Sequence, residues 1–143
     1  AEMLKLGLEL PACTVALSAQ TDFNLQGASM TPIRKSDYVL PVERYQDLRA
    51  QYLGDHDPSD PRASPLFAGF RGASPVHIQV AKREILYDDN IAMAAQLRAD
   101  SVDVELIEFD HGFHVFQLLA GKVPAADQAL DTATNFICAH LQR

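Results

Sequence analysis

The chain has 143 residues and a mass of 15.7 kDa, which is about the size of one domain. A composition of 48% apolar and 22% charged residues excludes a chain that is disordered throughout or of low complexity. With 12 basic and 19 acidic residues the formal charge is -7, which argues against nucleic acid or an anionic membrane surface as a partner.

Nothing in the sequence suggests a membrane segment or a disulfide framework. No apolar run reaches the roughly 18–20 residues that cross a bilayer, and the first residues lack the layout of a signal peptide. The two cysteines, Cys13 and Cys138, each lie in an apolar stretch, where a free thiol behaves as a small hydrophobic residue. We therefore expect a cytoplasmic protein without a membrane span, with Cys13 in the core.

The first half of the chain predicts one helix end, one strand and a long excursion. Glu2–Gly7 is typical of the end of a helix that Gly7 stops, so an element is cut at residue 1. Ala12–Ser18 is continuously apolar, as in a buried strand covered on both faces. Asn24–Phe70 has no strand-like run and only one helical segment, near Val42–Tyr52. We interpret it as an excursion that carries helices.

The second half predicts alternating strands and helices. Pro75–Val80 is a second strand, in which His77 is expected to be a hydrogen-bonded core residue, and Val102–Phe109 is a third strand with the alternation of an edge position. A helix capped by Asp88 or Asp89 lies between them, and another covers Pro124–His140. The order strand, helix, strand, helix predicts an α/β fold with about three parallel strands and flanking helices.

Three loops follow the predicted strands, and ligands of open α/β sheets bind beyond the carboxyl ends of the strands. These loops are Ser18–Asp22, Ala81–Asp89 and Asp110–His114. A carboxylate from one loop and an imidazole from the next are expected to meet there. An acid that holds a histidine in the right tautomer, with the histidine as general base, makes up two thirds of a hydrolase triad.

Several motifs resemble the hormone-sensitive-lipase-like branch (bacterial family IV) of α/β-hydrolase esterases. They are Asp57-Pro58 with Asp60-Pro61 and Ala63-Ser64-Pro65-Leu66, the strand-plus-acid run Ile78 to Asp89, and Val102-Asp103-Val104-Glu105-Leu106 leading to His114-Val115-Phe116. The resemblance covers essentially the whole chain. It corresponds to the C-terminal segment of the α/β-hydrolase fold, the sixth to eighth strands with their helices. Asp57 and Asp60 themselves are predicted to form turns.

The resemblance implies the roles of two residues. Carried over by register, the acid falls on Glu84 and the base on His114. The residues Phe113, Val115 and Phe116 are expected as substrate-binding pocket walls, by position only. The implied function is hydrolysis of short or medium acyl esters by a Ser-Glu-His triad, and no cofactor is required.

The sequence also leaves other candidates open. Asp88 and Asp89 compete for the acid role, and His111 lies near His114. These two histidines with Asp110 or Glu108 are a weak candidate for a set of metal ligands. We expect no metal.

The family's nucleophile motif, G-x-S-x-G, and its H-G-G-G-type oxyanion loop do not occur in the chain. The segments around Ser29 and Ser74 both lack the closing glycine. We therefore expect residues 1–143 to be a partial α/β-hydrolase domain, whose nucleophile-bearing N-terminal part is absent and is the chain's expected partner. Lys82-Arg83 and Asp110 also depart from the family pattern. The alternative is a nucleophile-less, hydrolase-like binding or structural module.

The incomplete sheet predicts self-association. The apolar strand Ala12–Ser18 is expected to have an open outer edge without a charged side chain, and such edges pair with other chains. The strand Val102–Phe109, which carries acidic residues, is the second choice for a homo-oligomer contact.

Overall fold

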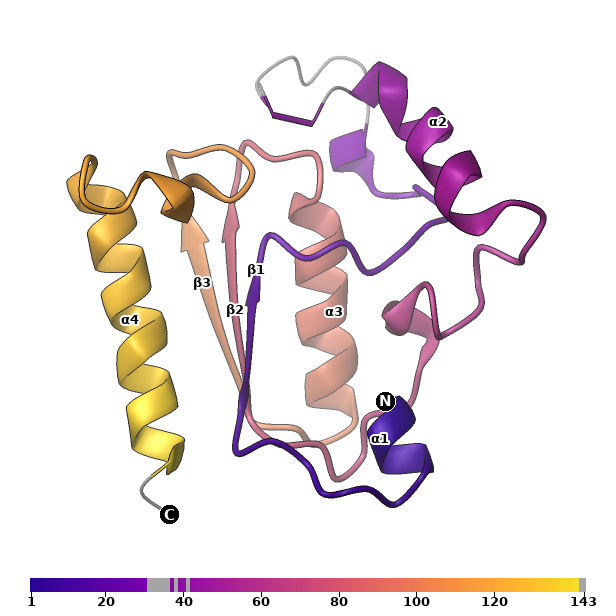
Figure 1. The fold of residues 1–143 in the computed structure, drawn as a ribbon, viewed down its shortest axis with the longest axis horizontal. Helices are drawn as coiled ribbons and strands as arrows, with labels where there is room; N and C mark the ends of the chain where they lie inside the picture. Colours follow the sequence, from indigo (N-terminus) through magenta and orange to yellow (C-terminus); the bar gives the residue numbers. More distant parts are fainter. Residues whose placement is uncertain (31–36, 38, 41, 142–143) are drawn as a thin grey trace.

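The computed structural model describes residues 1–30, 37, 39–40 and 42–141. The helices and strands are, in chain order, α1 (Glu2–Lys5), β1 (Thr14–Leu17), α2 (Val42–Leu53), β2 (Val76–Ala81), α3 (Tyr87–Ala99), β3 (Val104–Phe109) and α4 (Pro124–Leu141), with 3-10 turns η1 (Ala28–Met30), η2 (Pro65–Phe67) and η3 (Phe116–Leu119). The strands pair in parallel in the order β1-β2-β3. Figure 1 shows α3 on one face of this sheet and α4 on the other. The α/β fold predicted from the sequence is confirmed.

The central strand β2 is the most deeply buried part of the sheet, because it has a strand on each side and a helix on each face. All six of its residues are buried. For β1 the expectation of a strand covered on both faces is wrong: Thr14 is exposed and the next three residues are only half-buried. Within the described residues β1 pairs with β2 alone, and this edge position explains its exposure. β3 lies at the other edge of the described sheet, as predicted, and its residues are half-buried except for the exposed Glu105 and Glu108.

The helices α3 and α4 each turn a face of regularly spaced apolar residues toward the sheet. In α3, Met93, Ala94 and Leu97 lie three and four positions apart and belong to the cluster that includes Val76 and Ile78 of β2. In α4, the buried positions recur at the same spacing and are mostly alanine, so the helix approaches the sheet closely: Ala126, Ala129, Ala133 and Phe136. Pro124 is the first residue of α4, where its missing N–H has no effect on the helix.

The segment between β1 and β2 holds α2, η1 and η2 and, in its described part, no strand. Asp57 and Asp60 form the predicted turns: the carboxylate of Asp57 accepts the Ser59 N–H at 2.8 Å, and that of Asp60 accepts the Arg62 N–H at 2.9 Å. The hydroxyl of Ser64 then accepts the Phe23 N–H at 2.8 Å. These bonds attach the excursion to the loop that follows β1.

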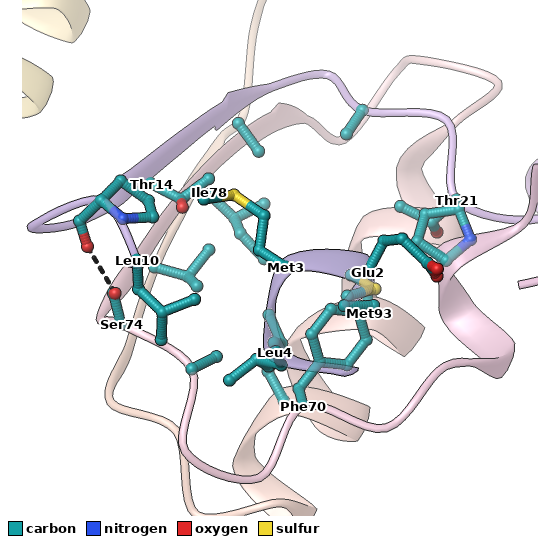
Figure 2. Close-up of a pocket in the computed structure, with 18 of the residues that line it drawn as sticks. Glu2, Met3, Leu4, Leu10, Thr14, Thr21, Phe70, Ser74, Ile78 and Met93 are labelled. Carbon is teal, nitrogen blue, oxygen red and sulfur yellow. Dashed lines mark hydrogen bonds between the residues drawn. The ribbon is translucent and has the colours of Figure 1, made fainter. Parts of the chain in front are cut away.

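An apolar cavity of about 370 Å³ lies between α1, the sheet and α3. Figure 2 shows Met3 and Leu4 of α1 facing Phe70, Ile78 and Met93 across it. Neither Glu84 nor His114 lines this cavity, so it is separate from the candidate site.

The two cysteines are less buried than expected. Cys13 is half-buried and Cys138 is exposed. The expectation of a core position for Cys13 is wrong, because this residue precedes the exposed end of the edge strand β1. None of the helices that the structure describes is long and apolar enough to cross a membrane.

Candidate active site

The loops after β1, β2 and β3 lie together at one end of the sheet, because all three strands are parallel and end at the same edge (Figure 1). Glu84 follows β2 in a tight turn, in which its N–H donates to the carbonyl of Ala81 at 3.0 Å. His114 follows β3 by a few residues. The polar side chains that the sequence placed in neighbouring loops therefore meet.

Glu84 is a fully buried carboxylate. Its Oε1 accepts two hydrogen bonds, from the Ala81 N–H at 2.7 Å and from the Ser18 hydroxyl at 2.8 Å. Its other oxygen, Oε2, lies 3.4 Å from Nδ1 of His114. That separation is slightly longer than an ordinary hydrogen bond. The His114 side chain is 19% exposed, so its ring joins a buried acid to the surface of the site.

The competing acids are bonded to other parts of the molecule. Asp89 Oδ2 accepts the N–H groups of Thr21 and Asp22, both at 3.1 Å, and Asp88 Oδ2 accepts the Ser29 N–H at 2.7 Å. The predicted capping role of these residues is wrong: the N-cap of α3 is Leu86, no side chain caps it, and both aspartates lie in the first helical turn. There Asp88 connects α3 to the excursion, and Asp89 connects α3 to the loop after β1.

One of the two basic residues before Glu84 pairs with an acid other than Glu84. Lys82 Nζ lies 2.7 Å from Asp110 Oδ1, so two departures from the family pattern form an ion pair with each other. This contact raises the pKa of Lys82 and lowers that of Asp110. Arg83 and His111 are exposed. Among the residues described by the structure, no group of three or more His, Cys, Asp or Glu side chains is arranged to hold a metal ion.

A hollow of about 450 Å³ borders His114. It opens between the loop after β1 and α2, where the rings of Phe23 and Tyr52 stack at 4.9 Å, and the Tyr45 hydroxyl donates to the Gln20 side chain. Burial raises the pKa of Tyr45, with a further contribution from Asp89. The lining of the hollow is mostly apolar and aromatic, and its polar side chains include Ser18, Gln20, Tyr45 and His114.

The expected pocket walls lie elsewhere. Phe116 is buried in the cluster under the start of α4, with Phe113 packed against it. Val115 has a left-handed backbone with φ 54°. None of the three lines the hollow beside His114, and their role in substrate binding stays a prediction.

The candidate nucleophiles excluded by sequence are bonded to backbone carbonyls. The Ser29 hydroxyl donates to Ile85 O at 2.6 Å, and that of Ser74 donates to Pro11 O beside the apolar cavity (Figure 2). Ser18, by contrast, was not singled out from the sequence, although its hydroxyl contacts Glu84. Its place at the end of a predicted strand was the available signal.

A buried acid and a histidine beyond the ends of parallel strands are typical of an α/β hydrolase. A family model described as alpha/beta hydrolase fold matches residues 1–118, and the chain belongs to this family. Among curated proteins, an acetyl-hydrolase of Streptomyces hygroscopicus is 30% identical over 92% of this chain, and an esterase of Acinetobacter venetianus is 31% identical over 89%. The chain spans 44% and 42% of their lengths.

Solved structures of esterases give the same result. An esterase from the bacterial hormone-sensitive lipase family superposes with a TM-score of 0.93 at 34% identity, over 97% of this chain and 47% of that one. The esterase EstE5 superposes with a TM-score of 0.95 at 27% identity, over 99% and 48%. The resemblance to hormone-sensitive-lipase-like esterases is confirmed.

Proposed function

We propose that this chain supplies the acid and the general base of a Ser-Glu-His triad in a carboxylic ester hydrolase. The observation that carries the proposal is the pair of Glu84 and His114, 3.4 Å apart, at the end of the sheet where the loops of β2 and β3 meet. Short and medium acyl esters are the proposed substrates. The mostly apolar hollow beside His114 suits the acyl chain of such an ester.

In this proposal Glu84 accepts the Nδ1–H of His114 and so holds Nε2 as the proton acceptor. His114 takes the hydroxyl proton of a serine that attacks the ester carbonyl, and then protonates the leaving alcohol. Water hydrolyses the acyl-enzyme with His114 again as the base. The serine and the oxyanion donors belong to the nucleophile-bearing part of the fold, which this chain does not contain.

The acid–base pair is testable in this chain through the tautomer of His114. We expect the neutral imidazole to carry its proton on Nδ1, as measured by the ¹⁵N shifts of the ring at alkaline pH. In Glu84→Gln the side-chain carbonyl oxygen of the glutamine must take the place of Oε1. That position accepts hydrogen bonds from the Ser18 hydroxyl and the Ala81 N–H, which an NH₂ group cannot do. The amide NH₂ then faces Nδ1 and shifts the proton to Nε2.

The exposed His111 is the internal control, and its tautomers should not change in Glu84→Gln. If the His114 ring has the same tautomer in both proteins, the two residues do not form the proposed pair.

The chain alone is expected to be inactive, because histidine and acid without a nucleophile and oxyanion donors cannot form an acyl-enzyme. With a short-chain chromogenic ester, the wild type should hydrolyse no faster than His114→Ala. Faster hydrolysis by the wild type would reveal a nucleophile within these residues.

The open edge of β1 and the adjoining apolar cavity offer a surface for the nucleophile-bearing part of the same fold. Reading the coding region upstream of residue 1 tests this directly. An in-frame G-x-S-x-G motif supports the triad, whereas a start codon near residue 1 supports the alternative of a nucleophile-less, hydrolase-like binding or structural module.

A further inference from the structure

Ser18 lies at the end of β1 in an unusual backbone conformation. Its φ is 51°, in the left-handed region that residues other than glycine rarely adopt. The residue is 3% exposed, although its neighbours in β1 are only half-buried. Such conformations persist where surrounding contacts fix them, and they concentrate at functional sites.

The Ser18 hydroxyl joins the two loops of the acid–base pair. It donates to Glu84 Oε1 at 2.8 Å, and it accepts the N–H of Val115, the residue after His114, at 3.2 Å. Val115 is itself left-handed, with φ 54°, which is exceptional for a β-branched residue. One side chain therefore contacts both the carboxylate and the backbone beside the imidazole.

We propose that Ser18 is a positioning residue for the acid–base pair. With the Ala81 N–H it fixes Oε1 of Glu84, so that Oε2 is directed at His114. Through Val115 it fixes the loop that carries the imidazole. The inference rests on the proposed function of Glu84 and His114, and it adds the residue of the β1 loop that sets their mutual orientation.

Two variants separate the hydroxyl from the backbone. Ser18→Ala removes the hydroxyl and keeps a side chain at a positive φ, whereas Ser18→Gly removes the hydroxyl and suits this conformation. We expect both variants to lose the Nδ1–H tautomer preference of His114, as measured by ¹⁵N shifts. We also expect the Val115 amide to exchange with solvent about five- to tenfold faster, because it has lost a buried hydrogen-bond acceptor.

Ser29→Ala is the matched control. It removes another buried hydroxyl that bonds the same loop, at Ile85 O, and does not contact Glu84 or His114. This variant should reduce the thermal stability and leave the His114 signals unchanged.

Each outcome is decisive. A change in both Ser18 variants and not in Ser29→Ala supports the inference. If the His114 tautomer changes in Ser18→Ala alone, the effect belongs to the backbone conformation and the inference is overturned. The inference is also overturned if the tautomer changes in neither Ser18 variant. If the wild type has the Nδ1–H tautomer and Glu84→Gln alters it while the Ser18 variants do not, only the positioning role fails. If Glu84→Gln alters nothing, the proposed function fails with it.

Discussion

Asp89 is a buried carboxylate with an unusual proton affinity. It is 4% exposed, and burial raises its pKa from 3.8 to about 6, against the two backbone N–H bonds from Thr21 and Asp22 that favour the charged form. Between these two pH values the folded protein holds a proton that the unfolded chain has lost. The contribution of this group to stability is therefore present below about pH 4 and is lost as the pH rises to about 6.

Asp89→Asn should remove that pH dependence while its carbonyl oxygen keeps both N–H bonds. We expect the free energy of unfolding of the wild type to fall between pH 4 and 6 by on the order of 2 kcal/mol more than that of the variant. Urea denaturation at several pH values measures the difference. The exposed Asp103→Asn is the control, and a parallel pH dependence in wild type and Asp89→Asn would contradict the expectation.

Single residues also show how far the sequence could predict the site. The family resemblance pointed to Glu84 and His114, and the structure brings their side chains to 3.4 Å, while their catalytic roles stay a prediction. Asp89 was expected to cap α3, but it bonds a loop that precedes it by 67 and 68 residues in the sequence. Long-range contacts of this kind, like those of Ser18, depend on the packed arrangement of three loops and leave no local pattern.

The interface of α4 with the sheet contains a buried polar network. The side-chain amide of Gln79 in β2 donates to Ala129 O of α4 at 2.6 Å and lies 2.9 Å from Nε2 of His77. His77 Nδ1 lies 2.9 Å from Glu105 Oε2 of β3. Since the Gln79 amide donates to Nε2 and the carboxylate of Glu105 accepts, the proton of the imidazole lies on Nδ1. Gln117 of η3 completes the network by donating to Gln79 Oε1 at 2.9 Å. The prediction of a hydrogen-bonded core role for His77 is confirmed.

Gln79→Leu should destabilise this interface. It preserves most of the volume but leaves the amide of Gln117 and the ring of His77 buried without their partner. We expect a loss of about 2–4 kcal/mol in the free energy of unfolding, as measured by denaturant titration. The control is Gln128→Leu on the exposed face of α4, expected within about 0.5 kcal/mol of the wild type. Equal midpoints for the two variants would mean that the network contributes nothing measurable.

Among the elements, the sequence predicted β2, α3 and α4 well, because their apolar periodicity reflects the burial they have. β1 was predicted too long and too buried, as Ala12–Ser18 rather than Thr14–Leu17. Its continuous apolar run is suited to a strand with neighbours on both sides, and in the described residues it has only one.

At the scale of the whole molecule, the sheet that the described residues form ends at the apolar strand β1, which pairs there with β2 alone. The N–H groups of Thr14 and Ser18 donate toward β2, at Pro75 O and Gln79 O. Since successive residues of a strand alternate in direction, the N–H of Val15 between them points away from β2. The polar backbone groups on this side are available to another strand, as open edges generally are.

We expect the chain to self-associate through this edge at tens of micromolar, and Val15→Lys to abolish the association. Size-exclusion chromatography with light scattering over a dilution series measures both. Ile107→Lys on the opposite edge strand is the control, and it should associate like the wild type. A wild type that stays monomeric over the whole series would show that the edge is protected.

The Ser18 hydroxyl also has a consequence for the order of folding. Its two bonds join residues that are 66 and 97 positions apart, whereas β2, α3 and β3 follow one another directly along the chain. Contacts between distant positions require the closure of long loops and form after local ones. The two bonds of Ser18 are thus expected to form late, on a βαβ unit that is already in place. Contacts that are absent from the transition state for folding slow the unfolding reaction without accelerating folding, so we expect the two bonds of Ser18 to prolong the lifetime of the native state once it has formed.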